Sequence, residues 1–85
     1  MARVMELIEQ ERVERGMSAE RFANLIGITT TTYSRQRRGK QELGMETFQA
    51  YAKFARKAGN LTLLRALGAF ALSLNPDEIT INPSE

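Results

Sequence analysis

The sequence predicts a small all-α domain of five helices. Its 85 residues are enough for one domain with a modest core. Apolar residues recur at three- and four-residue spacing in five separate stretches, and residues that commonly begin or end helices lie between them. We therefore expect a helical domain over residues 1–74 and a separate C-terminal tail over residues 75–85.

The first expected helix spans residues 2–15. Its apolar stripe consists of Val4, Leu7, Ile8 and Val13. The acids and bases interleaved with this stripe are typical of a solvated face. Gly16 ends the helix, because glycine is favoured at the position just after a helix.

The second expected helix starts at Ser18, whose hydroxyl is a good N-cap. Four of its residues are expected to face inward: Phe22, Ala23, Leu25 and Ile26. Gly27 follows, and a tight turn between two helices needs the positive φ that glycine adopts most easily. Ile28 is expected to fill this turn from below.

The third expected helix begins with Thr29 as its N-cap and stops at Gly39. Thr30, Thr31 and Thr32 occupy its first turn, although threonine is a poor helix former. A sequence selected only for stability would avoid them, so we expect their hydroxyls and methyls to face a ligand. A solvated threonine cluster without a role is the alternative.

A polar loop over residues 40–44 leads to the fourth expected helix, residues 45–58, which Gly59 caps. A stripe of apolar residues recurs along it at helical spacing: Met45, Phe48, Tyr51, Ala52 and Ala55. We expect this stripe to be core rather than a ligand site.

The fifth expected helix follows Asn60, runs over residues 61–74 and is broken by Pro76. It carries two apolar stripes, one of Leu61, Leu64, Leu67 and Ala71 and the other of Leu63, Phe70 and Leu74. A helix that is apolar on two sides is buried on two sides. We expect the second stripe to meet the same helix of a second subunit. A wide contact within one chain is the alternative.

In the tail, Ile79-Thr80-Ile81 alternates like a short strand. A single strand is not stable by itself. We expect Ile79 and Ile81 either to pair with their symmetry mates across a dimer or to belong to a frayed terminus.

Positive charge is concentrated in the third expected helix and its end. From Thr29 to Lys40 there are four bases and no acid, a charge of +4, while the rest of the chain has 8 bases and 10 acids, a charge of −2. The net charge of +2 therefore comes from this segment. A small domain that concentrates its positive charge on one helix is predicted to bind nucleic acid.

The composition argues against other classes of function. The chain has no cysteine and no histidine, which disfavours a disulfide framework, a metal site and an enzyme, so we expect no cofactor. Residues 1–10 lack the apolar region of a signal peptide. The longest apolar run, residues 61–74, is too short for a membrane span. A cytoplasmic location without membrane contact is expected.

A pattern of short motifs extends without gaps from about Val4 to Gly59. It consists of Gly16-Met17-Ser18, Phe22-Ala23, Leu25-Ile26-Gly27-Ile28-Thr29, Tyr33-Ser34-Arg35, Arg38-Gly39-Lys40 and Met45-Glu46-Thr47-Phe48. This pattern resembles the helix-turn-helix domain of the Cro and cI class of phage repressors. The resemblance implies a lambda-repressor-like fold, usually dimeric, that binds double-stranded DNA and regulates transcription, here as a repressor. We expect no small-molecule ligand, because 85 residues leave no room for an effector domain beside the helix-turn-helix.

In that family the third helix enters the major groove with its N-terminal residues toward the base edges. The resemblance makes four residues candidates for reading bases: Thr30, Thr31, Ser34 and Arg35. Arg35 could bind O6 and N7 of guanine with two hydrogen bonds. Phosphate contacts position a protein without specifying sequence. The candidates for them are Ser18, Thr29, Thr32, Arg37, Arg38, Lys40 and Gln41.

Arg37 departs from the family pattern, because that position is usually Glu, paired with an arginine at the position of Arg12. Two cations would meet here. We expect either that Glu11 or Glu14 compensates or that Arg37 turns out to the DNA.

Three further positions depart from the pattern. Ala19 replaces a common Gln, and Gln36 replaces a residue that is usually apolar and buried. Tyr33 stands where Ile or Val is commoner, and we expect its ring to fill the core while its hydroxyl points outward.

The departures at Ala19, Gln36 and Arg37 leave room for a protein-interaction module of the same fold that has lost DNA binding. An antitoxin-like chain, which binds its own promoter and holds a partner with its tail, is a second alternative. RNA binding is disfavoured, because the one aromatic residue of the third helix, Tyr33, is placed inside and offers no stacking platform.

Overall fold

The computed structural model describes residues 2–74, which form five helices and, within that range, no strand. The helices are α1 (Ala2–Glu14), α2 (Ala19–Ile26), α3 (Thr30–Arg37), α4 (Met45–Ala58) and α5 (Leu61–Leu74). The all-α class and the five predicted helices are confirmed. The predicted tail, with Ile79 and Ile81, and the side chain of Leu74 lie outside the described residues.

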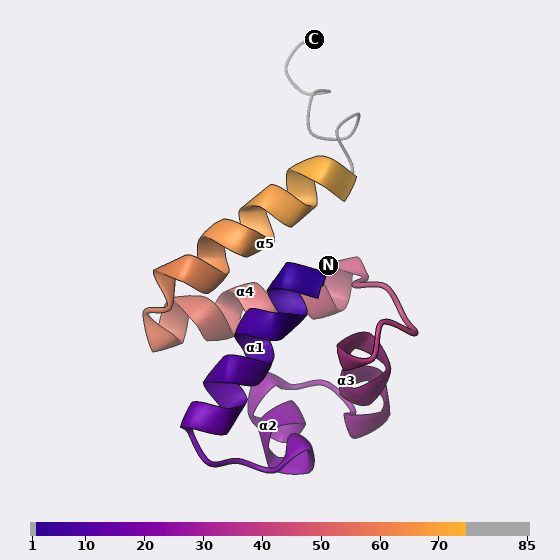
Figure 1. Cartoon of the computed structure of the whole chain (residues 1–85), viewed down its shortest axis with the longest axis vertical. Coiled ribbons are helices and arrows are strands. Elements are labelled where there is room, and N and C mark those ends of the chain that lie inside the picture. The colour runs from indigo at the N-terminus through magenta and orange to yellow at the C-terminus, as the bar shows by residue number, and fades with distance from the viewer. Residues whose placement is uncertain (1, 75–85) are drawn as a thin grey trace, which may run out of the picture.

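Figure 1 shows α2 and α3 together at one end of the molecule and α5 at the opposite end. α1 and α4 lie between them: α1 packs against both α3 and α5, and α4 packs against both α2 and α5. α3 is therefore supported by α1 and α2 from behind and lies away from α5.

The core draws a fully buried side chain from each helix. These are Ile8, Phe22, Tyr33, Tyr51 and Leu63. The Phe22 ring meets the Tyr33 ring edge-on, with centroids 5.7 Å apart, and meets the Phe54 ring in the same way at 5.3 Å. Edge-to-face pairs of this kind add about 0.5–1.5 kcal/mol beyond the burial of their area. The first pair fixes α3 against α2, and the second fixes α2 against α4.

The turn between α2 and α3 depends on Gly27. Its φ is 96°, in the left-handed region that favours glycine, and its backbone N–H donates to the carbonyl of Ala23 at 2.8 Å. Thr29 already caps the next helix. The two helices are therefore joined by a very short connection, which restricts their relative orientation.

The expectation that Leu63 lies in a dimer seam is wrong, because Leu63 is 0 % exposed within a single chain. α5 packs against both α1 and α4, so its buried arc combines Leu63 and Leu67 from the two predicted stripes, and Phe70 packs against the same core. Leu61 and Leu72 instead remain 63 % and 57 % exposed. Among the described side chains, the large apolar ones that α5 exposes are therefore Leu61 and Leu72, neither of which belongs to the predicted second stripe.

Three other residues that were expected to face inward are exposed: Val13, Leu25 and Met45. Each lies in the first or last turn of its helix, and Leu25 points away from the core beside the buried Ile26. Leu43 shows the opposite error, since it is buried although the loop that contains it was expected to be polar. Within residues 2–74, no helix has the length and apolar character that a membrane span requires.

Candidate nucleic-acid interface

α3 has a buried side and an open side. Tyr33 and Gln36, three residues apart, are fully buried and therefore lie on the inner face of the helix. Thr31 and Arg35, four residues apart, are exposed on the opposite side, and Arg38 continues their line just past the helix end. The open side is thus a hydroxyl followed by two guanidinium groups.

The threonines in the first turn of α3 divide into two kinds. Thr29 caps the helix: its Oγ1 accepts the backbone N–H of Thr32 at 3.1 Å and donates to the Thr32 hydroxyl at 2.9 Å. These two hydroxyls therefore have a structural use. Thr30 and Thr31 have no such role in the cap, so a structural reason accounts for only part of the threonine run.

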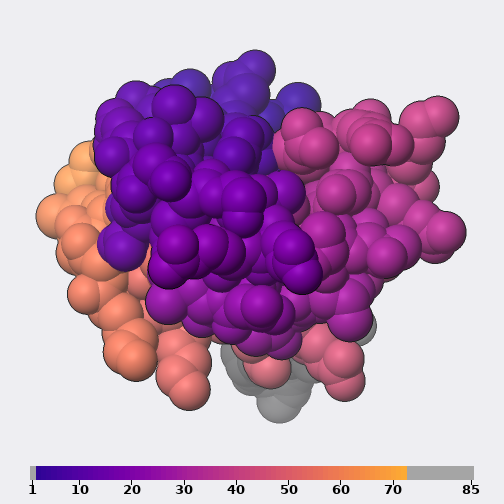
Figure 2. Space-filling model, turned by 90° about the horizontal axis from the view of Figure 1, so that it is seen from below, coloured from indigo at the N-terminus to yellow at the C-terminus, as the bar shows by residue number. Residues whose placement is uncertain are grey.

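The chain reverses immediately after α3 and keeps its bases together. Gly39 has φ 75°, and the backbone N–H of Lys40 donates to the carbonyl of Arg35 at 2.8 Å, which closes the helix end. Arg35, Arg38, Lys40 and Gln41 are all exposed there. In Figure 2 the magenta atoms of α3 and of the loop after it stand out on one side of the molecule.

Ser18 occupies the start of α2. Its Oγ accepts the backbone N–H of Arg21 at 3.1 Å, and the residue is exposed. The hydroxyl therefore still has its own hydrogen to donate, beside first-turn N–H groups that lack partners within the helix. This combination suits a phosphate.

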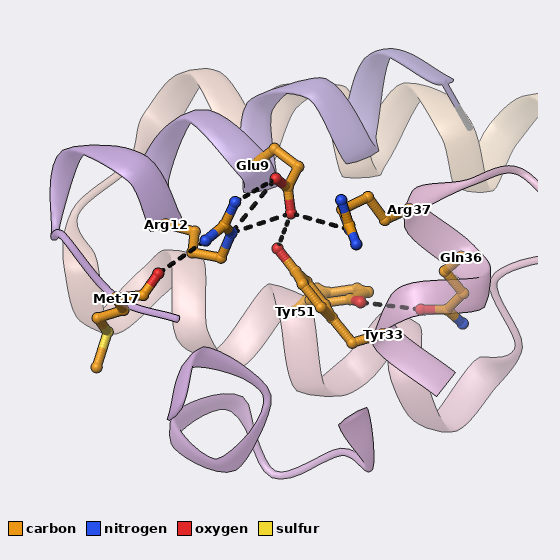
Figure 3. Close-up of polar contacts among 7 residues, drawn as sticks. All are labelled: Glu9, Arg12, Met17, Tyr33, Gln36, Arg37 and Tyr51. Atoms are coloured by element: carbon orange, nitrogen blue, oxygen red, sulfur yellow. Dashed lines mark hydrogen bonds and ion pairs between the residues drawn. The ribbon is translucent and has the colours of Figure 1, made fainter. Parts of the chain in front are cut away.

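Glu9 of α1 lies at the centre of a cluster that joins α1 to α3 (Figure 3). Its carboxylate lies 2.9 Å from Nη2 of Arg12, accepts a hydrogen bond from the hydroxyl of Tyr33 and lies 3.7 Å from Nε of Arg37. Arg12 also donates from Nη1 to the carbonyl of Met17 at 2.8 Å. One carboxylate therefore forms ion pairs with two guanidinium groups and accepts a hydrogen bond from a phenol.

Residues 8–57, more than half of the chain, match the helix-turn-helix family. The chain belongs to the Cro/cI-type helix-turn-helix family. This membership supports a DNA-binding helix-turn-helix regulator, and the family is not an enzymatic one. No curated protein and no solved structure matches the chain.

The charge compensation at the helix-turn-helix differs from our expectation. Neither Glu11 nor Glu14 contacts Arg37; Glu11 instead lies 2.8 Å from Nε of Arg15. Glu9 compensates the charge of Arg37 instead, because it lies one turn before Arg12 on the side of α1 that faces α3. The acid that the family usually carries on the third helix is thus supplied here by α1. A carboxylate three residues before Arg12 was the only signal for it in the sequence.

The expectation that the Tyr33 hydroxyl points outward is also wrong, because that hydroxyl is buried against Glu9. Burial raises the pKa of Tyr33, and the neighbouring carboxylate raises it further. Burial also tends to raise the pKa of Glu9, but hydrogen bonds from Arg12 and Tyr33, with the charges of Arg12 and Arg37, lower it below its ordinary value of 4.5. At neutral pH the cluster therefore consists of an ionised Glu9 and a protonated Tyr33.

Gln36, another departure from the family pattern, has hydrogen-bond partners inside the domain for both its amide oxygen and its amide nitrogen. Its Oε1 accepts from the hydroxyl of Tyr51 at 2.9 Å, and its Nε2 donates to Oγ1 of Thr47 at 3.0 Å and to the carbonyl of Glu42 at 3.3 Å. Among the described residues, no buried side-chain nitrogen or oxygen lacks a partner. The polar residue thus ties α3 to α4 instead of weakening the core.

Proposed function

We propose that this helix-turn-helix protein is a sequence-specific transcription regulator, a repressor, that binds double-stranded DNA as a homodimer with α3 in the major groove. The observation that carries this proposal is the division of α3. Tyr33 and Gln36 anchor its inner face, while Thr31 and Arg35 are exposed on the other side. Repression needs only that the protein occupy its operator.

The base-reading residues are proposed to be Thr30, Thr31, Ser34 and Arg35. Arg35 suits O6 and N7 of guanine, because its planar guanidinium offers two parallel donors. Thr31 offers a methyl group for the methyl of thymine and a hydroxyl for a neighbouring base or phosphate. None of these four side chains is among the fully buried residues.

The phosphate contacts are proposed to come from both ends of the helix-turn-helix. Ser18 lies at the start of α2, and Thr29 and Thr32 lie at the start of α3. Arg38, Lys40 and Gln41 follow α3 on an exposed turn. Arg37 was predicted to belong to this set, but its ion pair with Glu9 directs it toward α1 instead.

The homodimer is proposed to form through the outer face of α5. Leu61, Arg65, Gly68 and Leu72 share that face, because they follow one another at intervals of four, three and four residues. Leu61 and Leu72 are both more than half exposed, and the small Gly68 between them would let a second helix approach closely. A two-fold symmetric dimer predicts a palindromic operator with half-sites about one helical turn apart.

The departures from the family pattern do not favour the protein-interaction alternative. Gln36 is satisfied within the domain, Arg37 is paired with Glu9, and Ala19 packs against the core. All three changes therefore have an internal explanation, and the exposed bases on α3 are retained.

The test is a selection of binding sites from random-sequence duplex DNA at near-physiological salt, followed by sequencing. The proposal predicts an enriched two-fold symmetric motif whose half-site spacing gives the dimer geometry. Failure to enrich any motif, with association to a protein partner that is insensitive to salt, would favour the interaction module instead, because phosphate contacts make DNA binding strongly salt-dependent.

A further inference from the structure

We propose that Glu9 is a positioning residue that keeps Arg37 away from DNA phosphates and so lowers the affinity of this protein for DNA of arbitrary sequence. The proposal rests on the proposed DNA-binding function. It assigns a role to a carboxylate on α1, outside the two helices α2 and α3 that form the helix-turn-helix.

Arg37 is the exception among the bases of α3 and its end. Its Nε lies 3.7 Å from Oε2 of Glu9, and its side chain is 35 % exposed. Within residues 2–74, Arg35, Arg38 and Lys40 have no carboxylate within ion-pair distance. Three of the four positive charges of this segment are therefore open to a phosphate, and the fourth is directed toward α1.

Glu9 cannot follow Arg37 to the DNA, because other groups fix its carboxylate. Arg12 donates to it from Nε and from Nη2, the latter at 2.9 Å, and Tyr33 donates from the opposite helix (Figure 3). The Glu9 side chain is only 24 % exposed. A phosphate that draws Arg37 outward must therefore break the contact with Glu9.

Open space lies beside the Arg37 side chain. α1 and the end of α3 border a hollow of about 510 Å³, whose lining includes Met5, Glu6, Glu9, Arg37 and Arg38. The Arg37 side chain lines this hollow and therefore has room to leave Glu9 and turn toward solvent. Removing the Glu9 charge leaves Arg37 near the Arg12 cation without an acid between them, and this repulsion favours the outward position.

The expected consequence is a gain in sequence discrimination. Non-specific binding depends almost entirely on the number of phosphates that a protein neutralises, whereas specific binding also draws on base contacts. Keeping one cation away from the phosphates therefore lowers non-specific affinity and leaves the base-reading residues unchanged.

The experiment measures the salt dependence of binding to a mixed-sequence duplex between about 50 and 200 mM salt, with fluorescence anisotropy and the full chain. Four variants are compared with the unsubstituted protein: Glu9→Gln, Arg37→Gln, the two together, and Glu6→Gln. Glu6→Gln is the matched control, because it removes the same charge from the same helix, and Glu6 lines the same hollow. The ion-pair partner of Glu6 is Arg3, at 3.8 Å, and not Arg37. Circular dichroism verifies that each variant is folded.

We expect Glu9→Gln to steepen the slope of log affinity against log salt by about 0.9. Its affinity should therefore fall about three-fold more than that of the unsubstituted protein between about 50 and 200 mM salt. Arg37→Gln alone should leave the slope unchanged, and the double variant should return to the unsubstituted value. Glu6→Gln should have a smaller effect than Glu9→Gln on the slope.

A shallower slope in Arg37→Gln alone would overturn the proposal, because Arg37 would then already contact a phosphate. The slope of Arg37→Gln tests the proposal even if Glu9→Gln does not fold. Equal slopes for Glu9→Gln and Glu6→Gln would also overturn it. If the unsubstituted protein shows no salt-dependent affinity for duplex DNA, the proposed function itself fails, an outcome distinct from the other two.

Discussion

The hydroxyl of Tyr33 donates a hydrogen bond to the carboxylate of Glu9, 24 positions earlier in the chain. The bond joins the inner face of α3 to α1 while the Tyr33 ring packs edge-on against Phe22 of α2. A single side chain thus positions α3 against two other helices, through an apolar contact and a charge-assisted hydrogen bond.

Replacing Tyr33 by Phe keeps the ring and removes this hydrogen bond. We expect the free energy of unfolding at pH 7 to fall by about 1.5–3 kcal/mol, the usual range for a bond to a charged group. Urea denaturation of Tyr33→Phe, Glu9→Gln and the double variant measures it. The two losses should be less than additive, because both variants remove the same contact. Strict additivity would mean that the two side chains do not interact.

Glu9 should make stability depend on pH in the acid range. The pKa of Glu9 is lower in the folded protein than its ordinary value of 4.5, so the unfolded chain binds more protons as the pH falls past that value. The stability that Glu9 contributes is present above pH 4.5 and is lost as the pH falls through the lower, folded pKa.

Thermal or urea unfolding from pH 7 down to acid measures this dependence. The Glu9→Gln variant should lose less stability over the acid range than the unsubstituted protein does. Glu6→Gln, whose side chain is 71 % exposed, should follow the unsubstituted curve. Parallel curves for Glu9→Gln and the unsubstituted protein would contradict the pKa argument.

Replacing Gln36 by Leu restores the apolar residue that the family usually carries. It should nevertheless destabilise this protein by about 1–3 kcal/mol, because the buried Tyr51 hydroxyl loses its acceptor at 2.9 Å. Adding Tyr51→Phe should recover most of the loss, since both polar partners are then gone. Equilibrium unfolding of the two single variants and the double variant tests this, and a double variant weaker than either single one would refute it.

Arg35 and Lys40 should differ in how they affect DNA binding. Arg35→Ala is expected to cost about 1–3 kcal/mol on the selected operator and to relax the preference at one base position. Lys40→Ala should weaken binding to all sequences to a similar extent and make the salt slope shallower by about 1. Titrations on operator and mixed duplexes separate the two, and a uniform loss for Arg35→Ala would make Arg35 a phosphate contact only.

The two faces of α5 should separate stability from association. Leu63→Ala is expected to lower the free energy of unfolding by about 2–5 kcal/mol, because Leu63 is fully buried. Leu61→Ser with Leu72→Ser should instead yield a folded monomer, since both residues are exposed within one chain. Sedimentation measures the mass of each variant. A folded dimer that survives the serine pair would place the interface elsewhere.

Local signals in the sequence were sufficient for the five helices and for the place of the positive charge. Ser18, Gly27 and Thr29 end or begin helices through bonds within a few residues of themselves, so their effect can be predicted without the rest of the fold. The bases after α3 are likewise adjacent in the chain, and they gather at one end of the helix wherever that helix lies.

Only the tertiary structure decided which side chains meet. Packing against two other helices rotates α5 so that Leu63 is buried and Leu61 is not, although both fit a helical stripe. The partner of Arg37 is Glu9, which lies 28 positions before it, and no spacing along the chain predicts a contact between these two residues. Helix boundaries follow from neighbours in sequence, whereas rotation about the helix axis and charge pairing follow from neighbours in space.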